Sequence, residues 1–193
     1  MHPYRLEMDA YLGRVLTRSE QPITSGRPEG ALENLVADIV RYRATAEMRQ
    51  QIHVAIIDAK YLVEPLPGGQ VTVGALYRTY PAEHHLVVLE LGGGALIELA
   101  DELAHSQAIA VSGLRYRRSD TGARDVLVQS RNISADGHYL VVVDSGLAAS
   151  GASLPALQQA GRRHDLVVGI RQALKQYLDL HDSIAPYTDQ RVR

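Results

Sequence analysis

The sequence predicts an α/β protein in which a parallel β-sheet is flanked by helices. The main observation is that two segments repeat one order: a short apolar strand, a turn of small residues and an amphipathic helix. Strands that are apolar throughout are typical of parallel sheets with both faces covered. The composition agrees, since 46% of the 193 residues are hydrophobic and 22% are charged, as in ordinary globular proteins. We expect one domain over residues 1–193, with N-terminal helices over 1–50 and the α/β core over 51–193.

Two helices are predicted in the N-terminal part. The stronger pattern begins at Ala31 and runs towards Met48, with apolar residues at helical spacing. A weaker helical pattern covers about Arg5 to Leu16. The stretch Ser19 to Glu29 between them is polar and contains prolines and glycine, so we expect no regular structure there.

The core begins with strands and the first repeated unit. β-Branched and aromatic residues predict strands over Ile52–Ile57, Tyr61–Val63 and Val71–Tyr80. The first unit then follows as the strand Leu86–Leu91, a glycine turn and a helix. The turn consists of Gly92, Gly93 and Gly94, and the inner face of the helix carries Leu96, Leu99, Ala100 and Leu103.

The second unit has the same design. It comprises the strand Tyr139–Val143, the turn Asp144–Ser153 and a helix that Gly161 ends. Further predicted elements are short strands over Ala108–Val111 and Leu166–Ile170 and a final helix over Arg171–Leu180.

The composition also excludes several classes of function. The chain has no cysteine, which removes disulfides, thiol nucleophiles and thiolate metal sites and favours a cytoplasmic location. Its net charge is −2 without an extended basic region, so we expect no nucleic-acid partner. No stretch approaches the ~20 apolar residues of a membrane helix, so we expect no membrane contact. The histidines are isolated or directly adjacent, as at His84 and His85, and predict no metal-ligating residues.

The turn after the second strand is the first candidate site. In a parallel sheet, ligands bind beyond the carboxyl ends of the strands, where Asp144 could accept hydrogen bonds from sugar hydroxyls. Small residues leave the backbone N–H groups of the turn accessible to a phosphate. These residues are Ala148, Ala149, Ser150, Gly151, Ala152 and Ser153. The alternative is a strand-to-helix turn in which glycine serves packing and serine caps the helix, and spacing alone does not separate the two.

An arginine-rich segment is the second candidate. Five arginines fall between Arg115 and Arg131 in what we predict to be a hairpin or flap. Guanidinium groups bind phosphate in a bidentate manner, so Arg115 and Arg117 could grip a polyphosphate. A solvated charged loop is the alternative.

Val141 to Gly151 resembles the ribose-phosphate loop of the type I phosphoribosyltransferases, and within that family it is most similar to the uracil phosphoribosyltransferases. Tyr42 to Thr45, Leu89 to Gly94 and Leu114 to Arg118 follow in the places of three further family segments. The resemblance covers about Leu32 to Gly161.

This resemblance implies a homodimeric transferase that moves ribose 5-phosphate from phosphoribosyl pyrophosphate (PRPP) to a pyrimidine or another small nitrogen base, with Mg²⁺ on the pyrophosphate. By carry-over, Asp144 would hold the ribose hydroxyls and the small residues Ala148–Ser153 the 5-phosphate. The turn Gly92–Gly94 would leave room for the pyrophosphate, and Arg115 and Arg117 would cover it.

Two other hypotheses remain open. The family carries an arginine where this chain has Gly92–Gly94, and its uracil-recognising C-terminal segment has no counterpart here. These departures favour a non-catalytic sensor or assembly subunit that binds a nucleotide or PRPP. In addition, Val88 to Gly94 resembles the first motif of Rossmann-like methyltransferases, which would imply S-adenosylmethionine as the ligand.

Overall fold

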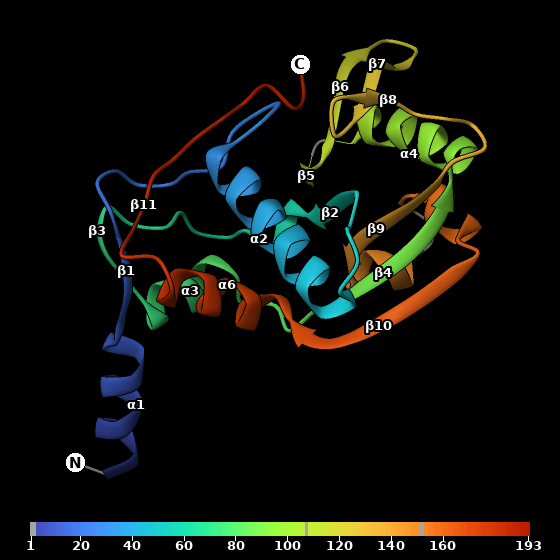
Figure 1. Cartoon of the computed structure of the whole chain (residues 1–193). Helices are drawn as coiled ribbons and strands as arrows, with labels where there is room; N and C mark the ends of the chain where they lie inside the picture. Colours follow the sequence, from blue (N-terminus) through green and yellow to red (C-terminus); the bar gives the residue numbers. More distant parts are fainter. Residues whose placement is uncertain (1–2, 107, 151–152) are drawn as a thin grey trace.

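The protein is built around a five-stranded central sheet. A computed structural model describes residues 3–106, 108–150 and 153–193 (Figure 1). The strand order is β10-β4-β9-β2-β5. The bounds are β10 Arg162–Gly169, β4 His85–Gly92, β9 His138–Asp144, β2 Val54–Asp58 and β5 Ile109–Ser112.

Strand direction differs from the prediction. Only β9 and β2 run parallel, and the other three neighbouring pairs of this sheet are antiparallel. The α/β class is therefore confirmed in its coarse form, as a mixed fold of helices and sheets, whereas the parallel sheet is wrong. The physical reason is that an apolar run reports burial on both faces, and burial carries no information about direction.

Four strands of this sheet, β2, β4, β5 and β9, contribute side chains to two cores, one on each face of the sheet. In β2, Val54 and Ile56 belong to one core, and Ala55 and Ile57 belong to the other. This is the alternation expected of a strand whose side chains point to opposite faces in turn. All four are fully buried, so neither face of β2 is open to solvent.

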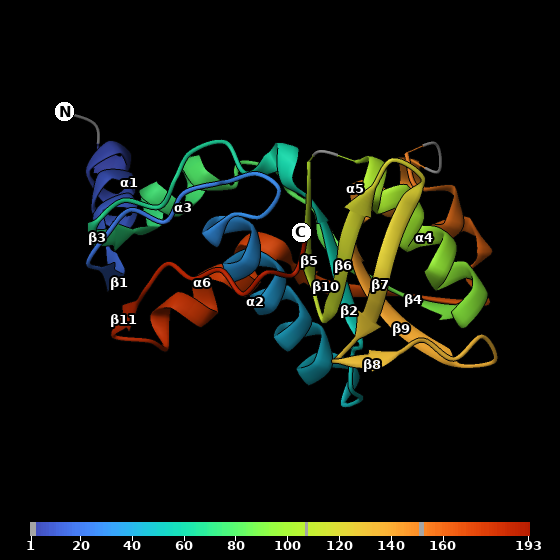
Figure 2. The same ribbon diagram turned by 90° about the horizontal axis from the view of Figure 1, so that it is seen from above.

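Helices cover both faces. Helices α2 (Ala31–Met48) and α6 (Ile170–Asp179) contribute to the core that contains Ala55. Helix α4 (Gly93–His105) and the 3₁₀ helix η2 (Pro155–Gln159) contribute to the other. Figure 2 shows α2 and α4 on opposite sides of the central strands. The predicted helices that correspond to α2, α4 and α6 are confirmed.

Two smaller three-stranded sheets flank the centre. One has the order β11-β1-β3, and the other is the hairpin sheet β6-β7-β8. The bounds are β11 Ser183–Ile184, β1 Val15–Ser19, β3 Gly69–Thr72, β6 Leu114–Ser119, β7 Gly122–Val128 and β8 Arg131–Asn132. The arginine-rich segment is thus a hairpin, as predicted.

The weaker helix predicted over about Arg5 to Leu16 is confirmed in its main part as α1 (Pro3–Gly13). Two predicted strands have other conformations. In the strand predicted over Tyr61–Val63, Tyr61 ends the 3₁₀ turn η1 (Ala59–Tyr61), and Leu62 and Val63 have no regular structure. The predicted strand Val71–Tyr80 is mostly helix α3 (Val73–Thr79). Thr72 is the reason, because its hydroxyl caps the helix by accepting the N–H of Ala75 at 3.2 Å.

The C-terminal segment returns across α2 and joins the hairpin sheet (Figure 1). Tyr116 donates its N–H to Arg191 at 2.9 Å, and Arg118 donates to Arg193 at 2.7 Å. This pairing extends β6 on the edge that β7 leaves open.

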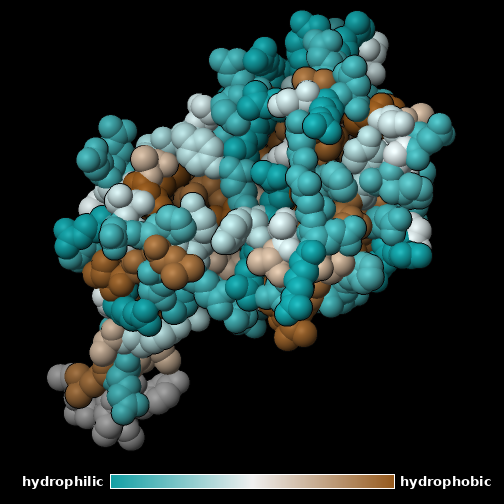
Figure 3. Space-filling view, in the orientation of Figure 1, coloured by the Kyte–Doolittle hydropathy of each residue, from teal (hydrophilic) through white to brown (hydrophobic). Residues whose placement is uncertain are grey.

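The visible surface is mainly hydrophilic. In Figure 3 the hydrophobic residues form separate patches rather than one broad face. Among the described residues, no helix is both long enough and apolar enough to cross a bilayer.

Candidate functional site

Six polar and aromatic residues gather at one end of the central sheet, a cluster that we call the His84 edge. Asp58 ends β2 and Asp144 ends β9, and these parallel strands finish side by side. His84 precedes β4, whose start lies beside the end of β9 because the two are antiparallel, with Leu86 opposite Asp144. The six residues are Asp58, Lys60, Tyr61, Tyr80, His84 and Asp144.

Asp144 is the buried centre of this edge. Its side chain is fully buried, and its two oxygens accept the N–H groups of Asp58 at 2.9 Å and of Leu147 at 2.8 Å. The bond from Leu147 caps the start of helix α5 (Ser145–Ser150). Gly146 allows this arrangement, since a Cβ there would lie 2.9 Å from Asp144 Oδ1 and 3.1 Å from the His84 ring. Asp144 therefore serves primarily to join β2, β9 and α5.

His84 connects Asp144 to two tyrosines. Its Nδ1 lies 3.2 Å from the hydroxyl of Tyr80 and 3.7 Å from Asp144 Oδ1. The edge of its ring meets Tyr61, with 4.4 Å between ring centroids. Burial, reinforced by the charge of Asp144, raises the pKa of Tyr80, so the phenol stays protonated at neutral pH. A protonated Tyr80 can donate to Nδ1, which leaves the proton of a neutral His84 on Nε2.

Asp58 and Lys60 form the charged rim of the edge. Lys60 Nζ lies 2.5 Å from Asp58 Oδ2 and 4.7 Å from the centre of the Tyr61 ring. The hydrogen bond to Asp58 raises the pKa of Lys60, so this amine is charged at neutral pH. The edge thus presents an ion pair beside two aromatic rings.

A cavity of about 350 Å³ opens beside His84, and we call it the His84 cavity. Its lining includes Tyr11, Tyr77, His84, His85, Arg171 and Lys175. The Arg171 guanidinium lies 4.2 Å from the centre of the Tyr77 ring and pairs with Glu83 at 2.9 Å. Aromatic rings and cationic groups therefore face the same space.

The structure separates the two predicted loops. Asp144 pairs with Leu86 at one end of β4, whereas Gly92 pairs with His138 at the other. At ~3.4 Å per residue, the two ends are ~20 Å apart. Gly92, Gly93 and Gly94 therefore do not share a site with Asp144.

The glycine turn has a packing role. A Cβ on Gly93 would overlap the carbonyl oxygen of Ser134, and the N–H of Gly93 donates to Gly137 at 2.8 Å. Nothing lies within 4 Å of a Cβ built on Gly92 or Gly94. Close approach of the loop before β9 is what requires glycine at one of the three positions.

The first part of the predicted phosphate turn is folded as the short helix α5. Ala148 is buried, Ala149 is exposed, and both lie within α5. The hydroxyl of Ser150 lies 3.3 Å from the carbonyl oxygen of Leu147 and 3.0 Å from Ser153 Oγ. Gly151 and Ala152 lie outside the described residues.

The two predicted arginines face different partners. Arg115 Nη2 pairs with Asp189 at 2.9 Å, and Arg117 pairs with Asp125 at 2.9 Å. Both belong to the hairpin sheet, and neither lines the His84 cavity.

In the described parts of the chain, no three His, Asp or Glu residues lie together in an arrangement that could hold a metal ion. Nothing tests Mg²⁺ binding, so it stays a prediction, as does the cytoplasmic location.

A comparison with family models decides the relationship. The model of the 5'-nucleotidase C-terminal domain matches residues 13–159, which is most of the chain. The chain belongs to this family.

Solved structures show the same fold for this 5'-nucleotidase C-terminal domain. A 5'-nucleotidase precursor from Thermus thermophilus superposes with a TM-score of 0.86 at 21% identity, covering 98% of this chain and 41% of its own. An NAD nucleotidase from Haemophilus influenzae gives 0.78 at 15% identity, covering 98% and 39%. The sulfate thiohydrolase SoxB from Thermus thermophilus, in complex with glycerol, gives 0.74 at 20% identity, covering 97% and 36%. The chain thus spans about two fifths of these proteins, and no curated protein sequence matches it.

The family assignment corrects the functional prediction. The resemblance to phosphoribosyltransferases is wrong, and so are transfer of ribose 5-phosphate, PRPP as substrate and the description of the chain as a transferase. The methyltransferase alternative is wrong for the same reason. The resemblance was local: small residues follow an apolar strand here as they do in the phosphoribosyltransferases, but in this chain Ser145–Ser150 form helix α5. No observation supports the homodimer.

The sequence reasoning missed most of the His84 edge. Asp58 and Asp144 each follow an apolar run in the sequence. This shared pattern could have predicted that the two aspartates lie at the same edge of the sheet. No sequence signal places His84 beside Asp144, because that contact depends on β4 being antiparallel to β9.

Proposed function

We propose that this domain recognises a nucleotide and binds its nucleoside part in the His84 cavity, as part of an enzyme that hydrolyses the nucleotide. The family match and the names of two similar proteins, a 5'-nucleotidase and an NAD nucleotidase, support a nucleotide as the ligand. The observation that carries the proposal is the lining of the cavity, where aromatic rings and cations meet.

The cavity has the chemistry that a nucleoside requires. Its volume of about 350 Å³ is within the range of small-molecule sites. Tyr11 and Tyr77 are partly exposed, at 42% and 37%, and offer ring surface to a base. His84 Nε2 can donate to a ring nitrogen or a ribose oxygen. Lys175, although paired with Asp179 at 3.0 Å, adds a cation on the same side, where a phosphate would be attracted.

The His84 edge would position this lining. Tyr80 holds Nδ1 of His84 by a hydrogen bond at 3.2 Å, and Asp144 packs beside the same ring at 3.7 Å. Because Asp144 is fixed by two backbone N–H groups, the ring has a rigid support. The phosphate-releasing step would belong to the larger protein, since the similar nucleotidases contain more than twice the length of this chain.

Titration with adenosine tests the proposal. We expect saturable binding by calorimetry, with amide shifts at Tyr77, His85 and Gly169 in NMR spectra. Replacing Tyr77→Leu removes a ring from the lining and should weaken binding by about tenfold, as expected for a lost aromatic contact to a base. The matched control is Tyr42→Leu, which removes a tyrosine that is 67% exposed and lies outside the cavity.

His84→Gln provides a second variant, because glutamine keeps a donor without the ring. It should weaken adenosine binding while the thermal unfolding curve stays cooperative. Absence of saturable binding by the unmodified chain would contradict the proposal. Equal losses in Tyr77→Leu and Tyr42→Leu would also contradict it.

A further inference from the structure

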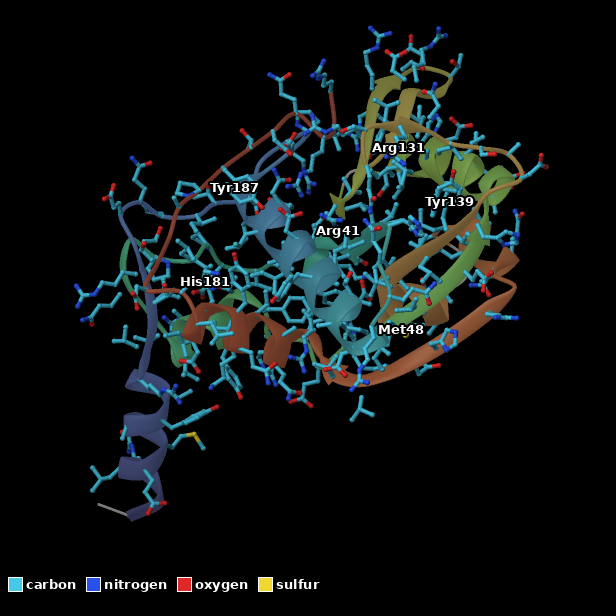
Figure 4. All side chains as sticks on the ribbon, in the orientation of Figure 1. Arg41, Met48, Arg131, Tyr139, His181 and Tyr187 are labelled. Carbon is cyan, nitrogen blue, oxygen red and sulfur yellow. The ribbon has the colours of Figure 1, made fainter. Side chains whose placement is uncertain are left out.

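A second cavity lies at the opposite end of the β2–β5 pair. Asp58 of the His84 edge pairs with Ile109 at one end of these strands. Ser112, which lines the second cavity, pairs with Ala55 at the other end. The cavity measures about 470 Å³, and we call it the Arg41 cavity. Helix α2, the end of β5, the hairpin sheet and the C-terminal segment all contribute to its wall. Figure 4 labels Arg41 on α2 and Tyr187 on the C-terminal segment.

Two carboxylates in this wall are already neutralised. Asp38 accepts two hydrogen bonds from Arg191, at 2.8 and 2.7 Å, and one each from Ser112 and Tyr187. Burial opposes the ionisation of Asp38, but these hydrogen bonds outweigh it and hold its pKa below the usual range. Asp189 pairs with Arg191 at 2.7 Å and with Arg115 at 2.9 Å.

Arg41 is the arginine of this wall that pairs with no carboxylate among the described residues. Its Nε donates to Ser112 Oγ at 2.8 Å, which fixes the plane of the guanidinium. Across residues 3–106, 108–150 and 153–193, its two terminal nitrogens have no hydrogen-bond partner in the protein. Three arginines and two aspartates line the cavity, so one positive charge is left over, and it resides on Arg41. A fixed fork of free N–H groups matches a carboxylate or phosphate group.

A strained turn supplies a second, independent observation. Gln129 and Ser130 form the two-residue connection between β7 and β8, with φ of 49° and 65°. Such turns favour asparagine and glycine, because other residues are disfavoured at positive φ. Ser130 nevertheless occupies the second position, is exposed and lines the Arg41 cavity. Residues held at such angles cluster at ligand sites.

We propose that the Arg41 cavity binds a small organic anion, whose carboxylate or phosphate group is held by the Arg41 fork and by the hydroxyl of Ser130. The neutralised pairs around Asp38 and Asp189 form the rigid wall, and Arg41 supplies the net charge. This site is separate from the His84 cavity and does not depend on a nucleotide being bound there.

NMR titration of the ¹⁵N-labelled chain with inorganic phosphate and, separately, with sodium acetate tests the proposal. We expect saturable shifts of the Gly113, Leu114 and Ser130 amides with at least one of the two anions. A larger response to phosphate or to acetate identifies which group the site prefers. Adenosine carries no oxyanion and should leave these amides unchanged, which separates this site from the His84 cavity.

Arg41→Gln should weaken the binding by about tenfold or more, the loss expected when hydrogen bonds to a charged group are removed. The matched control is Arg43→Gln on the same helix, because Arg43 pairs with Glu47 and lies outside the cavity. Ser130→Gly covers the case in which Arg41→Gln fails to fold. Glycine relieves the positive φ, so this variant should be at least as stable as the unmodified chain yet bind the anion more weakly.

Two results would overturn the proposal. One is the absence of saturable shifts at Gly113, Leu114 and Ser130 with both anions. The other is unchanged affinity in both Arg41→Gln and Ser130→Gly.

Discussion

His53 shows how a single half-buried side chain ties stability to pH. It lies directly before β2, and its Nδ1 accepts the N–H of Leu140 at 3.0 Å. The ring must be neutral at Nδ1 to accept this bond. Burial lowers the pKa of His53 from its ordinary 6.5, so the unfolded chain binds this proton more readily than the folded chain.

The free energy of unfolding should therefore fall as the pH drops below about 6.5, until the lowered folded-state pKa is passed. Above that window His53 is neutral in both states and contributes no pH dependence. His53→Asn retains an acceptor for Leu140 but cannot be protonated, so acidification should destabilise this variant less than the unmodified chain. Urea unfolding on both sides of the window measures the difference. His164→Asn on exposed β10 is the control, and equal slopes for His53→Asn and the unmodified chain would contradict the prediction.

At the next scale, the element that the sequence interpreted as a ligand loop is a packing contact. The turn Gly92–Gly94 connects β4 to α4, and only Gly93 is pressed against the backbone of Ser134. The three glycines are therefore not equivalent, although their sequence context is nearly the same.

Substitutions in this turn should have opposite signs. Gly93→Ala forces its Cβ into the Ser134 carbonyl and should destabilise the protein by about 1–3 kcal/mol. Gly94→Ala meets open space within α4 and should stabilise it by about 0.4–1 kcal/mol, because alanine loses less backbone entropy in a helix. Urea unfolding of both variants measures the effects. Equal effects would show that the contact with Ser134 does not decide the role of Gly93.

The two strand-turn-helix units also connect other strands than the parallel sheet predicts. After α4 the chain enters β5, which pairs with β2 rather than returning beside β4. After η2 the chain enters β10, which pairs antiparallel with β4. Neither unit places two parallel strands side by side, because neither helix is followed by a strand that adjoins the one before it.

Across the whole molecule, the C-terminal segment links parts that are distant in sequence. Arg191 is buried, binds Asp38 on α2 and donates to the carbonyl of Val111 in β5 at 3.0 Å. Its backbone carbonyl accepts the N–H of Tyr116 in β6. One residue therefore joins a helix, the central sheet and the hairpin sheet.

Removal of residues 186–193 should lower the free energy of unfolding by at least about 1.5–3 kcal/mol, the contribution of hydrogen bonds to a charged group. The amides of Tyr116 and Arg118 lose their acceptors and should exchange with solvent faster. Hydrogen exchange and urea unfolding measure the two effects. Arg193→Gln is the control, because it keeps the backbone pairing. Unchanged protection of Tyr116 in the truncated chain would contradict this role of the segment.

The sequence alone predicted much of the scaffold. It determined the positions of α2, α4 and α6, the apolar strands β4 and β9, and the hairpin between Arg115 and Arg131. These features depend on local periodicity and on burial, which each segment carries in its own residues. It also placed Asp144 at the end of a buried strand, where polar residues converge.

Only the tertiary structure decided strand direction, and strand direction decided which residues meet. An apolar strand buries both faces equally well in either direction, so the sequence of β4 is compatible with both. Because β4 is antiparallel to β9, His84 lies beside Asp144, and Gly92–Gly94 lie at the opposite end of β4. The Arg41 cavity also exists only in the tertiary structure, where α2, the C-terminal segment and the stretch from the end of β5 into the hairpin sheet meet.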